Sequence, residues 1–302
     1  MRLKDLQSLL HNDKKMRLAV VAAEEENVLI AVDDAFKNGV SVPILIGNEK
    51  AIKEIAKKAD INIDSYQIIN ANSLEESAEI AVKMVKQGQA DFLIKGLIDT
   101  SILVKQVLNK EYGLRTGKTL SHVMVYDVPQ YHKLLFLTDG GIMTYPDLDK
   151  KKNILENAVE VLGSLKYDEI KVACLAAKEK LNPKMPPTVD GDALKKMYLD
   201  GEFEKGVIVE GPISFDLAIS KEAASIKKYN SPVAGDADVL LVPNIEMGNG
   251  IGKTMTYFGN AISAGVIMGA SAPVVLVSRA DSYESKYYSI LLGALVAQKN
   301  KE

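Results

Sequence analysis

The sequence predicts an α/β protein built on a mostly parallel β-sheet, either as two domains or as one large one. From Met16 onward, short apolar runs rich in β-branched residues alternate with stretches of helical periodicity. Strands separated by helices of this length form βαβ units, in which both faces of the sheet are covered. The chain has 302 residues, of which 47% are hydrophobic and 25% charged. That composition is typical of a globular protein with a large core.

The first part of the chain carries the alternation most clearly. Strands are predicted at residues 16–22, 42–46, 67–70 and 91–95, and helices at 27–38, 50–58 and 74–87. Residues 1–15 are charged and dotted with leucine, which is typical of a short amphipathic helix and unlike the apolar core of a signal peptide. We therefore expect a cytoplasmic protein.

The next part of the chain is predicted to form an antiparallel pair of strands. The runs 121–128 and 133–138 lie close enough for a hairpin around Pro129, and we place the first domain boundary there. A second α/β series then begins with a helix at 148–162. Further strands are predicted at 170–175, 206–209 and 238–242, and helices at 193–200, 214–219 and 257–268. The Pro-rich connector 182–188 is not expected to be helical.

The segment 272–286 is the first candidate site. Residues 274–277 are uniformly apolar, as in a strand buried on both faces, and Ser278 and Arg279 follow at its carboxyl end. Ligands of open α/β sheets bind at this position. Arg279 could bind a phosphate or stabilise negative charge on a carbonyl oxygen, and Glu284 is a candidate proton acceptor. The alternative is that Asp281 and Glu284 form a capping box, with Ser278 and Arg279 in an ordinary loop.

The segment 90–105 is the second candidate. A strand ends at Lys95, and Gly96 permits close approach of the backbone to a ligand. Thr100 and Ser101 then open a helix whose free N–H groups favour an anion, and Lys95 and Lys105 add positive charge. The alternative is a plain turn from strand to helix with a capping hydroxyl.

A glycine-rich turn near residue 250 is a weaker candidate. Its spacing does not match a phosphate-binding P-loop. Asn244, Glu246 and Asn249 can nevertheless line a cleft beside it, although glycine loops without ligands are equally common.

Several classes of function are disfavoured. A formal net charge of −3 and a pI near 5.8 provide no basic surface for nucleic acid. No apolar run is long enough to span a bilayer. The three histidines have no metal-ligand spacing, and the only cysteine, Cys174, lies in a predicted buried strand. We expect no metal, no disulfide and no catalytic thiol.

Seven motifs in one order resemble the phosphate acetyl/butyryltransferase family, and most closely its phosphate butyryltransferase branch. The similarity runs from about Met16 nearly to the C-terminus. The motifs begin at Lys95, Ser121, Thr138 (with Pro146-Asp147-Leu148), Asn182, Gly235, Pro243 and Ser278.

The resemblance implies reversible transfer of an acyl group between coenzyme A and inorganic phosphate, with acyl phosphate as product and no further cofactor. The implied fold is two α/β domains of the isocitrate/isopropylmalate dehydrogenase-like type, with the active site in the cleft between them. Residues 1–128 and 270–302 would form the first domain and 129–269 the second. The resemblance also favours a homo-oligomer.

The same resemblance implies roles for individual residues. Ser278 would orient the thiol of coenzyme A, and Arg279 would bind phosphate and the reacting carbonyl. An ungapped match puts Ser285 at the position of the acidic base of acetyl-specific relatives, so the base is Glu284 or, as second choice, Asp281. The substrate-binding candidates are Lys95, Thr100, Ser101, Lys105, Ser121, Asn244, Glu246, Asn249 and Asp281.

Three alternatives remain open. The acyl group could be acetyl rather than butyryl or a branched chain, because the sequence does not reveal the size of the pocket. A dehydrogenase on the related fold would require a nicotinamide cofactor. It would usually also require a metal held by clustered aspartates. The third alternative is a non-catalytic sensor of phosphate or acyl phosphate built on the same cleft. The preferred acyl chain, the oligomeric state and the physiological direction are not determined by the sequence.

Overall fold

The computed structural model describes residues 1–11, 15–278 and 281–301, and it divides the chain into two compact units. The first unit comprises Leu3–Lys118 and Ala264–Glu302, and the second comprises Met1–Arg2 and Thr119–Ser263. Both boundaries fall earlier in the chain than expected after residues 128 and 269. The first one precedes the predicted hairpin because the two strands of that hairpin pair within the second unit.

The sheet of the first unit has the strand order β3-β2-β1-β4-β11-β10. These pairs are parallel except for β10 and β11, which are antiparallel. The strands are β1 (Met16–Val21), β2 (Ser41–Gly47), β3 (Gln67–Asn70), β4 (Phe92–Lys95), β10 (Ile262–Met268) and β11 (Val274–Val275).

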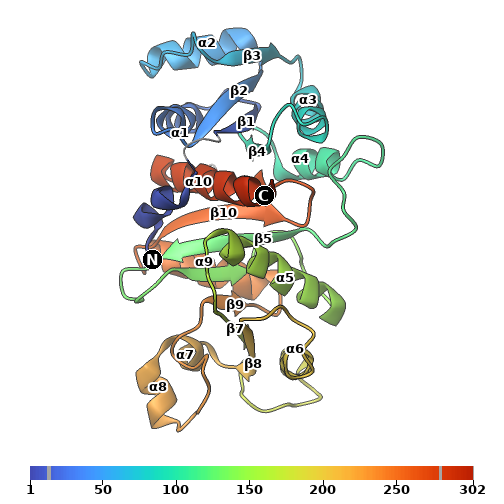
Figure 1. The fold of residues 1–302 in the computed structure, drawn as a ribbon, viewed down its shortest axis with the longest axis vertical. Helices are drawn as coiled ribbons and strands as arrows, with labels where there is room; N and C mark the ends of the chain where they lie inside the picture. Colours follow the sequence, from blue (N-terminus) through green and yellow to red (C-terminus); the bar gives the residue numbers. More distant parts are fainter. Residues whose placement is uncertain (12–14, 279–280, 302) are drawn as a thin grey trace. The chain divides into compact units, whose positions relative to one another are not determined.

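Helices cover both faces of this sheet. In Figure 1, α1 and α10 lie on one side of the sheet, and α3 and α4 lie on the other. Capping side chains start several of them: Asn48 accepts the N–H of Ala51 at the start of α2, and Ser73 accepts that of Glu76 at α3. The elements are η1 (Leu3–Leu9), α1 (Glu26–Lys37), α2 (Glu49–Lys58), α3 (Leu74–Lys86), α4 (Thr100–Val107) and α10 (Tyr283–Lys299).

The second unit has the strand order β5-β6-β9-β7-β8. Strands β5 and β6 form the predicted antiparallel pair, and the other pairs are parallel. The strands are β5 (Ser121–Asp127), β6 (Leu135–Thr138), β7 (Ile170–Leu175), β8 (Val207–Ile213) and β9 (Val239–Leu241). The helices are α5 (Leu148–Ser164), α6 (Pro186–Leu199), α7 (Phe215–Ile219), α8 (Lys221–Ile226) and α9 (Ile245–Tyr257).

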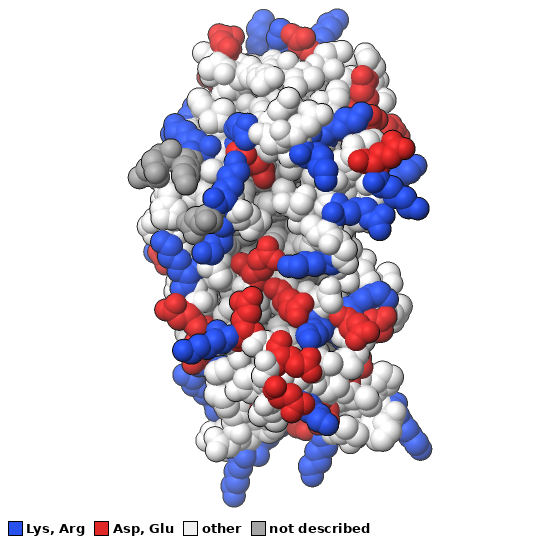
Figure 2. Space-filling model, turned by 45° about the vertical axis from the view of Figure 1, so that its right-hand side comes forward, with Lys and Arg blue, Asp and Glu red and all other residues white. Residues whose placement is uncertain are grey.

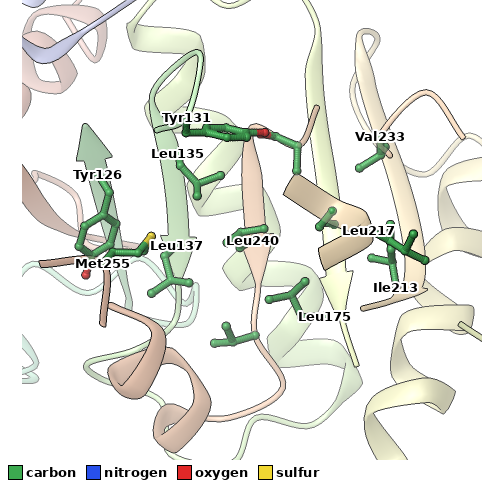
Figure 3. Close-up of a cluster of buried hydrophobic side chains, with 14 of the residues drawn as sticks. Tyr126, Tyr131, Leu135, Leu137, Leu175, Ile213, Leu217, Val233, Leu240 and Met255 are labelled. Atoms are coloured by element: carbon green, nitrogen blue, oxygen red, sulfur yellow. The ribbon is translucent and has the colours of Figure 1, made fainter. Parts of the chain in front are cut away.

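A cluster of buried side chains fixes one face of the second unit (Figure 3). Leu137, Leu175 and Leu240 come from three neighbouring strands, and Leu217 of α7 and Met255 of α9 pack with them. Removal of this apolar surface from water is the main force that holds these helices on the sheet. The cluster thereby holds α9 against the sheet, and α9 begins just beyond the carboxyl end of β9.

Two predicted elements around residue 257 were wrong. The glycine-rich turn is helix α9, and the predicted helix 257–268 is mostly strand β10. Asn244 caps α9 by accepting the N–H of Met247, which offsets part of the low helix propensity of glycine. Residues 262–268 are apolar in a short run, and such a run does not by itself distinguish strand from helix.

The Pro-rich connector also differs from expectation. Helix α6 begins at Pro186, inside the stretch that we expected to be non-helical. Proline is tolerated in the first helical turn because its missing N–H has no intrahelical partner there. The prediction failed because it applied a rule for helix interiors to a helix start.

Two surface properties bear on possible partners. On the face shown in Figure 2, basic and acidic side chains are interspersed. Within the part of the chain that the structure describes, every helix is too short or too polar to cross a membrane.

Candidate active site

The carboxyl ends of three neighbouring parallel strands meet in the first unit. Val21 of β1 pairs with Lys95 of β4, and Ile94 of β4 pairs with Val275 of β11. The loops that follow these strands therefore leave the same edge of the sheet, where open α/β folds place their ligands. Ser278, three residues beyond β11, is exposed on the last of these loops. Arg279, the predicted anion-binding cation, lies outside the described residues.

Lys95 lies at this edge, but its ammonium group points inward. It is almost fully buried, and Nζ donates to the carbonyl oxygens of Gly96 at 3.2 Å and Ile98 at 2.9 Å. The ammonium group thus orders the loop between β4 and α4. Its predicted contact with a phosphate remains a prediction.

Gly96 was expected to let the backbone approach a ligand, and the structure provides a different reason for glycine. A Cβ atom at this position would lie 2.3 Å from the carbonyl oxygen of Ala22. The backbone here continues alongside the β1–α1 connection, with Leu97 N–H donating to Ala22 O at 2.8 Å. The glycine serves close packing of two backbone segments.

The predicted helix start is confirmed. Helix α4 begins at Thr100, which is half-buried, and Ser101 and Lys105 are exposed. Asp99 is the N-cap residue, although its carboxylate accepts no capping hydrogen bond. Thr100, Ser101 and Lys105 therefore lie on the helix that follows Lys95 across the loop from β4 to α4.

The start of α10 differs in detail from the capping-box interpretation. Ser282 caps the helix by accepting the N–H of Ser285. Asp281 instead accepts the N–H of Ser278 at 2.7 Å, which closes the loop on itself. Glu284 lies half-buried in the first helical turn. The predicted pair of Asp281 and Glu284 therefore does not form a capping box.

The sequence analysis missed Lys286. Its side chain is 0% exposed, and Nζ donates to the carbonyl oxygens of Ser278 at 3.1 Å and Asp281 at 2.8 Å. The Glu25 carboxylate lies 3.6 Å from the same nitrogen. The signal in the sequence is a lysine that precedes the mostly apolar stretch 289–297 by two tyrosines.

In the second unit, several backbone N–H groups converge on the carboxylate of Asp139. Its carboxylate accepts four backbone N–H groups, at 2.7 to 3.1 Å. The donors are His122, Gly141, Ile142 and Met143. The carboxylate therefore ties the start of β5 to the loop after β6, and two of the motifs noted in the sequence meet here.

Ser121 lies beside this anchor but inside the protein. It is 0% exposed, and its hydroxyl accepts the side-chain amide of Asn157 at 2.8 Å. The same amide donates to the carbonyl oxygen of Thr119 at 2.9 Å. Ser121 thus joins β5 to α5, and its substrate-binding role remains a prediction.

Helix α9 begins at the same edge of this unit. Asn244 is its N-cap, and the hydroxyl of Tyr145 donates to Glu246. This hydrogen bond raises the pKa of Tyr145. Asn249 is exposed on the helix. Of the three candidates here, two therefore have structural partners, and Asn249 faces outward.

Glycine allows this helix to approach its neighbours closely. A Cβ at Gly248 would lie 2.6 Å from the Cα of Gly140, and one at Gly252 would lie 2.4 Å from the hydroxyl oxygen of Tyr126. Gly248 and Gly252, which the sequence analysis assigned to a glycine-rich turn, are therefore required by packing, whereas a Cβ at Gly250 would meet open space.

The single thiol of the chain is disfavoured as a nucleophile. Cys174 is buried, and desolvation raises the pKa of its thiol to about 12, so the thiolate is disfavoured. In residues 1–11, 15–278 and 281–301, no three acidic, histidine or cysteine side chains are grouped so that they could hold a metal ion.

Comparison with known proteins places these features in a family. The family model "phosphate acetyl/butaryl transferase" matches residues 3–81 and 71–294. A phosphate butyryltransferase of Clostridium acetobutylicum is 46% identical over 281 residues, which is 93% of each chain. A phosphate acetyltransferase of Thermotoga maritima is 42% identical, covering 94% of this chain and 96% of its own.

A solved structure supports the same family assignment. The crystal structure of a branched-chain phosphotransacylase from Enterococcus faecalis superposes with a TM-score of 0.82 at 33% identity. The match covers 93% of this chain and 99% of the other. The chain thus belongs to the phosphate acetyl/butaryl transferase family.

Proposed function

We propose that this protein is a phosphate acyltransferase that moves a short acyl group reversibly between coenzyme A and inorganic phosphate. The main support is near-full-length similarity to phosphate butyryltransferases, at 46% identity for the one from C. acetobutylicum. The loops that follow β1, β4 and β11 leave one edge of a sheet, as a ligand site of this fold class requires.

The chemistry requires an anion site and stabilisation of a developing oxyanion. An oxygen of phosphate attacks the thioester carbonyl, the tetrahedral intermediate collapses, and coenzyme A leaves as a thiolate that takes up a proton. In our proposal, Arg279 binds phosphate and stabilises the oxyanion, and Ser278 orients the thiol. Holding both reactants together supplies much of the rate, so no acyl-enzyme is required.

We assign the proton transfer to Glu284. Asp281 already accepts the N–H of Ser278 at 2.7 Å, and the hydroxyl of Ser285 lies 3.2 Å from that of Ser282. Glu284 is a half-buried carboxylate in the same helical turn. It is therefore better placed than either neighbour to exchange a proton with a thiol.

The preferred acyl group is proposed to be butyryl or a similar short or branched chain. A phosphate acetyltransferase of T. maritima is nearly as similar, so acetyl transfer is the second candidate. One methylene in a pocket changes binding by only about 1–3 kcal/mol, so both activities are expected at different rates. A homo-oligomer remains an expectation.

A direct assay tests this proposal. Purified protein should release coenzyme A from butyryl-, isobutyryl- and acetyl-coenzyme A only when inorganic phosphate is present, with the highest kcat/KM for a four-carbon chain. Omission of phosphate is the control for simple thioester hydrolysis. Absence of phosphate-dependent release with all three thioesters would refute the proposal, and turnover of a nicotinamide cofactor would favour the dehydrogenase alternative.

Cys174→Ser should retain most of this activity. The thiol is buried and its pKa is raised to about 12, so it does not serve as a nucleophile at neutral pH. The measurement is kcat for the variant and the wild type at equal concentration, with thermal unfolding as a check on folding. Complete loss of turnover in a folded variant would indicate a covalent mechanism.

A further inference from the structure

The buried ammonium group of Lys286 lies beneath the loop that carries Ser278. Helix α10 places the side chain in the interior of the first unit, where it is 0% exposed. Burying a charged ammonium costs several kcal/mol unless partners replace the lost water. A hydrophobic residue would avoid this cost, so the partners of Lys286 indicate what the charge does.

Those partners come from two loops at the same sheet edge. Nζ donates to Ser278 O at 3.1 Å and to Asp281 O at 2.8 Å, and Glu25 Oε1 lies 3.6 Å away. Two of the three donors of the ammonium group are thus used in hydrogen bonds to backbone carbonyls, and the Glu25 carboxylate forms a longer ion pair with it. The group is therefore occupied by the protein and does not reach a substrate directly.

The loop also has contacts of its own that the lysine reinforces. Asp281 N–H donates to Ser278 O at 3.1 Å, and Ser278 N–H donates to Asp281 Oδ2 at 2.7 Å. Ser278 O thus accepts from both Asp281 and Lys286. In the sequence, Ser278 and Asp281 bracket Arg279.

The neighbouring strand β4 also ends in a buried lysine that binds backbone carbonyls. Lys95, at the end of β4, is also almost fully buried and donates to two carbonyl oxygens of the following loop, those of Gly96 and Ile98. Strands β4 and β11 are paired in parallel. Two adjacent loops at the candidate site are therefore each tied to a buried ammonium group.

We propose that Lys286 is a positioning residue for acyl transfer: by tying Ser278 and Asp281 to α10 and to Glu25, it holds Ser278, the residue proposed to orient the thiol, in place. The inference rests on the proposed function of this site. Groups that act in a transition state must be held closely, and a misplacement of about 1 Å can lower turnover about 10²-fold. The lysine acts through the backbone of the loop.

Lys286→Met tests the proposal, because methionine keeps an unbranched apolar stem and removes the charge. We expect kcat to fall roughly 10²-fold, with KM for phosphate and acyl-coenzyme A changed much less. Hydrogen–deuterium exchange should become faster at the amides of Ser278 and Asp281 while β1 and β4 stay protected. Lys299→Met, an exposed lysine on the same helix, is the matched control and should leave both readouts unchanged.

The outcomes are distinguishable. A folded Lys286→Met variant with wild-type kcat and wild-type exchange in this loop would overturn the inference. If that variant does not fold, Glu25→Gln decides, because it removes the charge beside Nζ and should give a smaller loss of kcat together with faster exchange in the loop. Wild-type values of both quantities in Glu25→Gln would then refute the inference. Absence of acyl transfer in the wild type would refute the proposed function, while exchange would still show whether Lys286 orders the loop.

Discussion

Replacing Arg279 with alanine is expected to lower kcat by roughly 10²-fold or more, the scale measured when one oxyanion donor is removed from an enzyme. The guanidinium group is assigned both to phosphate and to the carbonyl oxygen that becomes negatively charged. Its loss should therefore raise KM for phosphate as well. Steady-state kinetics with phosphate varied at saturating acyl-coenzyme A separates the two effects.

Arg279→Lys is the matched variant, because it keeps the positive charge and loses the planar pair of donors. Activity between those of the wild type and Arg279→Ala is expected, since a lysine binds phosphate as a point charge. The free energy of unfolding should change little in either variant. Wild-type turnover in Arg279→Ala would remove Arg279 from the mechanism, and with it the role assigned to the loop after β11.

Asp139→Ala is expected to lower the free energy of unfolding by about 3–5 kcal/mol, because the buried N–H of His122 is left without an acceptor, which costs roughly 1–3 kcal/mol, and three part-buried N–H groups lose their acceptor as well. The carboxylate is 2% exposed and accepts N–H groups from both the start of β5 and the loop after β6. Urea unfolding followed by circular dichroism measures the change.

Two control variants make this test specific. Asp139→Asn keeps one acceptor oxygen and should lose clearly less stability than Asp139→Ala. Asp147→Ala removes a carboxylate that caps α5 in an exposed position and should cost about 1 kcal/mol, as is usual for a helix cap. Equal losses of unfolding free energy in Asp139→Ala and Asp147→Ala would show that the four hydrogen bonds of Asp139 stabilise the protein no more than an ordinary helix cap does.

Local patterns predicted most of the first unit. The alternation of apolar runs with amphipathic stretches located β1 to β4 and the helices between them, because burial on both faces of a parallel sheet leaves a continuous apolar run in the sequence. The hairpin of β5 and β6 was also predicted, and the pairing is antiparallel. These features depend on residues close together in the chain.

Predictions failed where the local pattern did not reveal which residues a segment packs against or pairs with. Helix α9 contains several glycines and was expected to be a turn, but Gly248 is needed where α9 approaches Gly140 closely. The helix is held by the apolar cluster that includes Met255. Residues 262–268 were expected to be helical, but they pair with β11. Gly140 lies far from α9 in the sequence. Strand β11 follows β10 closely, but a short apolar run does not by itself distinguish a strand from a helix.

At the candidate site, too, some features were predicted from the sequence and others became visible only in the tertiary structure. Motif order alone identified the family, and the apolar runs placed Lys95 and Ser278 near strand ends, because the covalent order of a βαβ chain fixes which residues follow each strand. Only the tertiary structure showed that the ammonium groups of Lys95 and Lys286 point into the protein, and that Asp139 gathers four backbone N–H groups. Those roles depend on carbonyl and N–H groups brought together by folding, whose positions the sequence pattern does not encode.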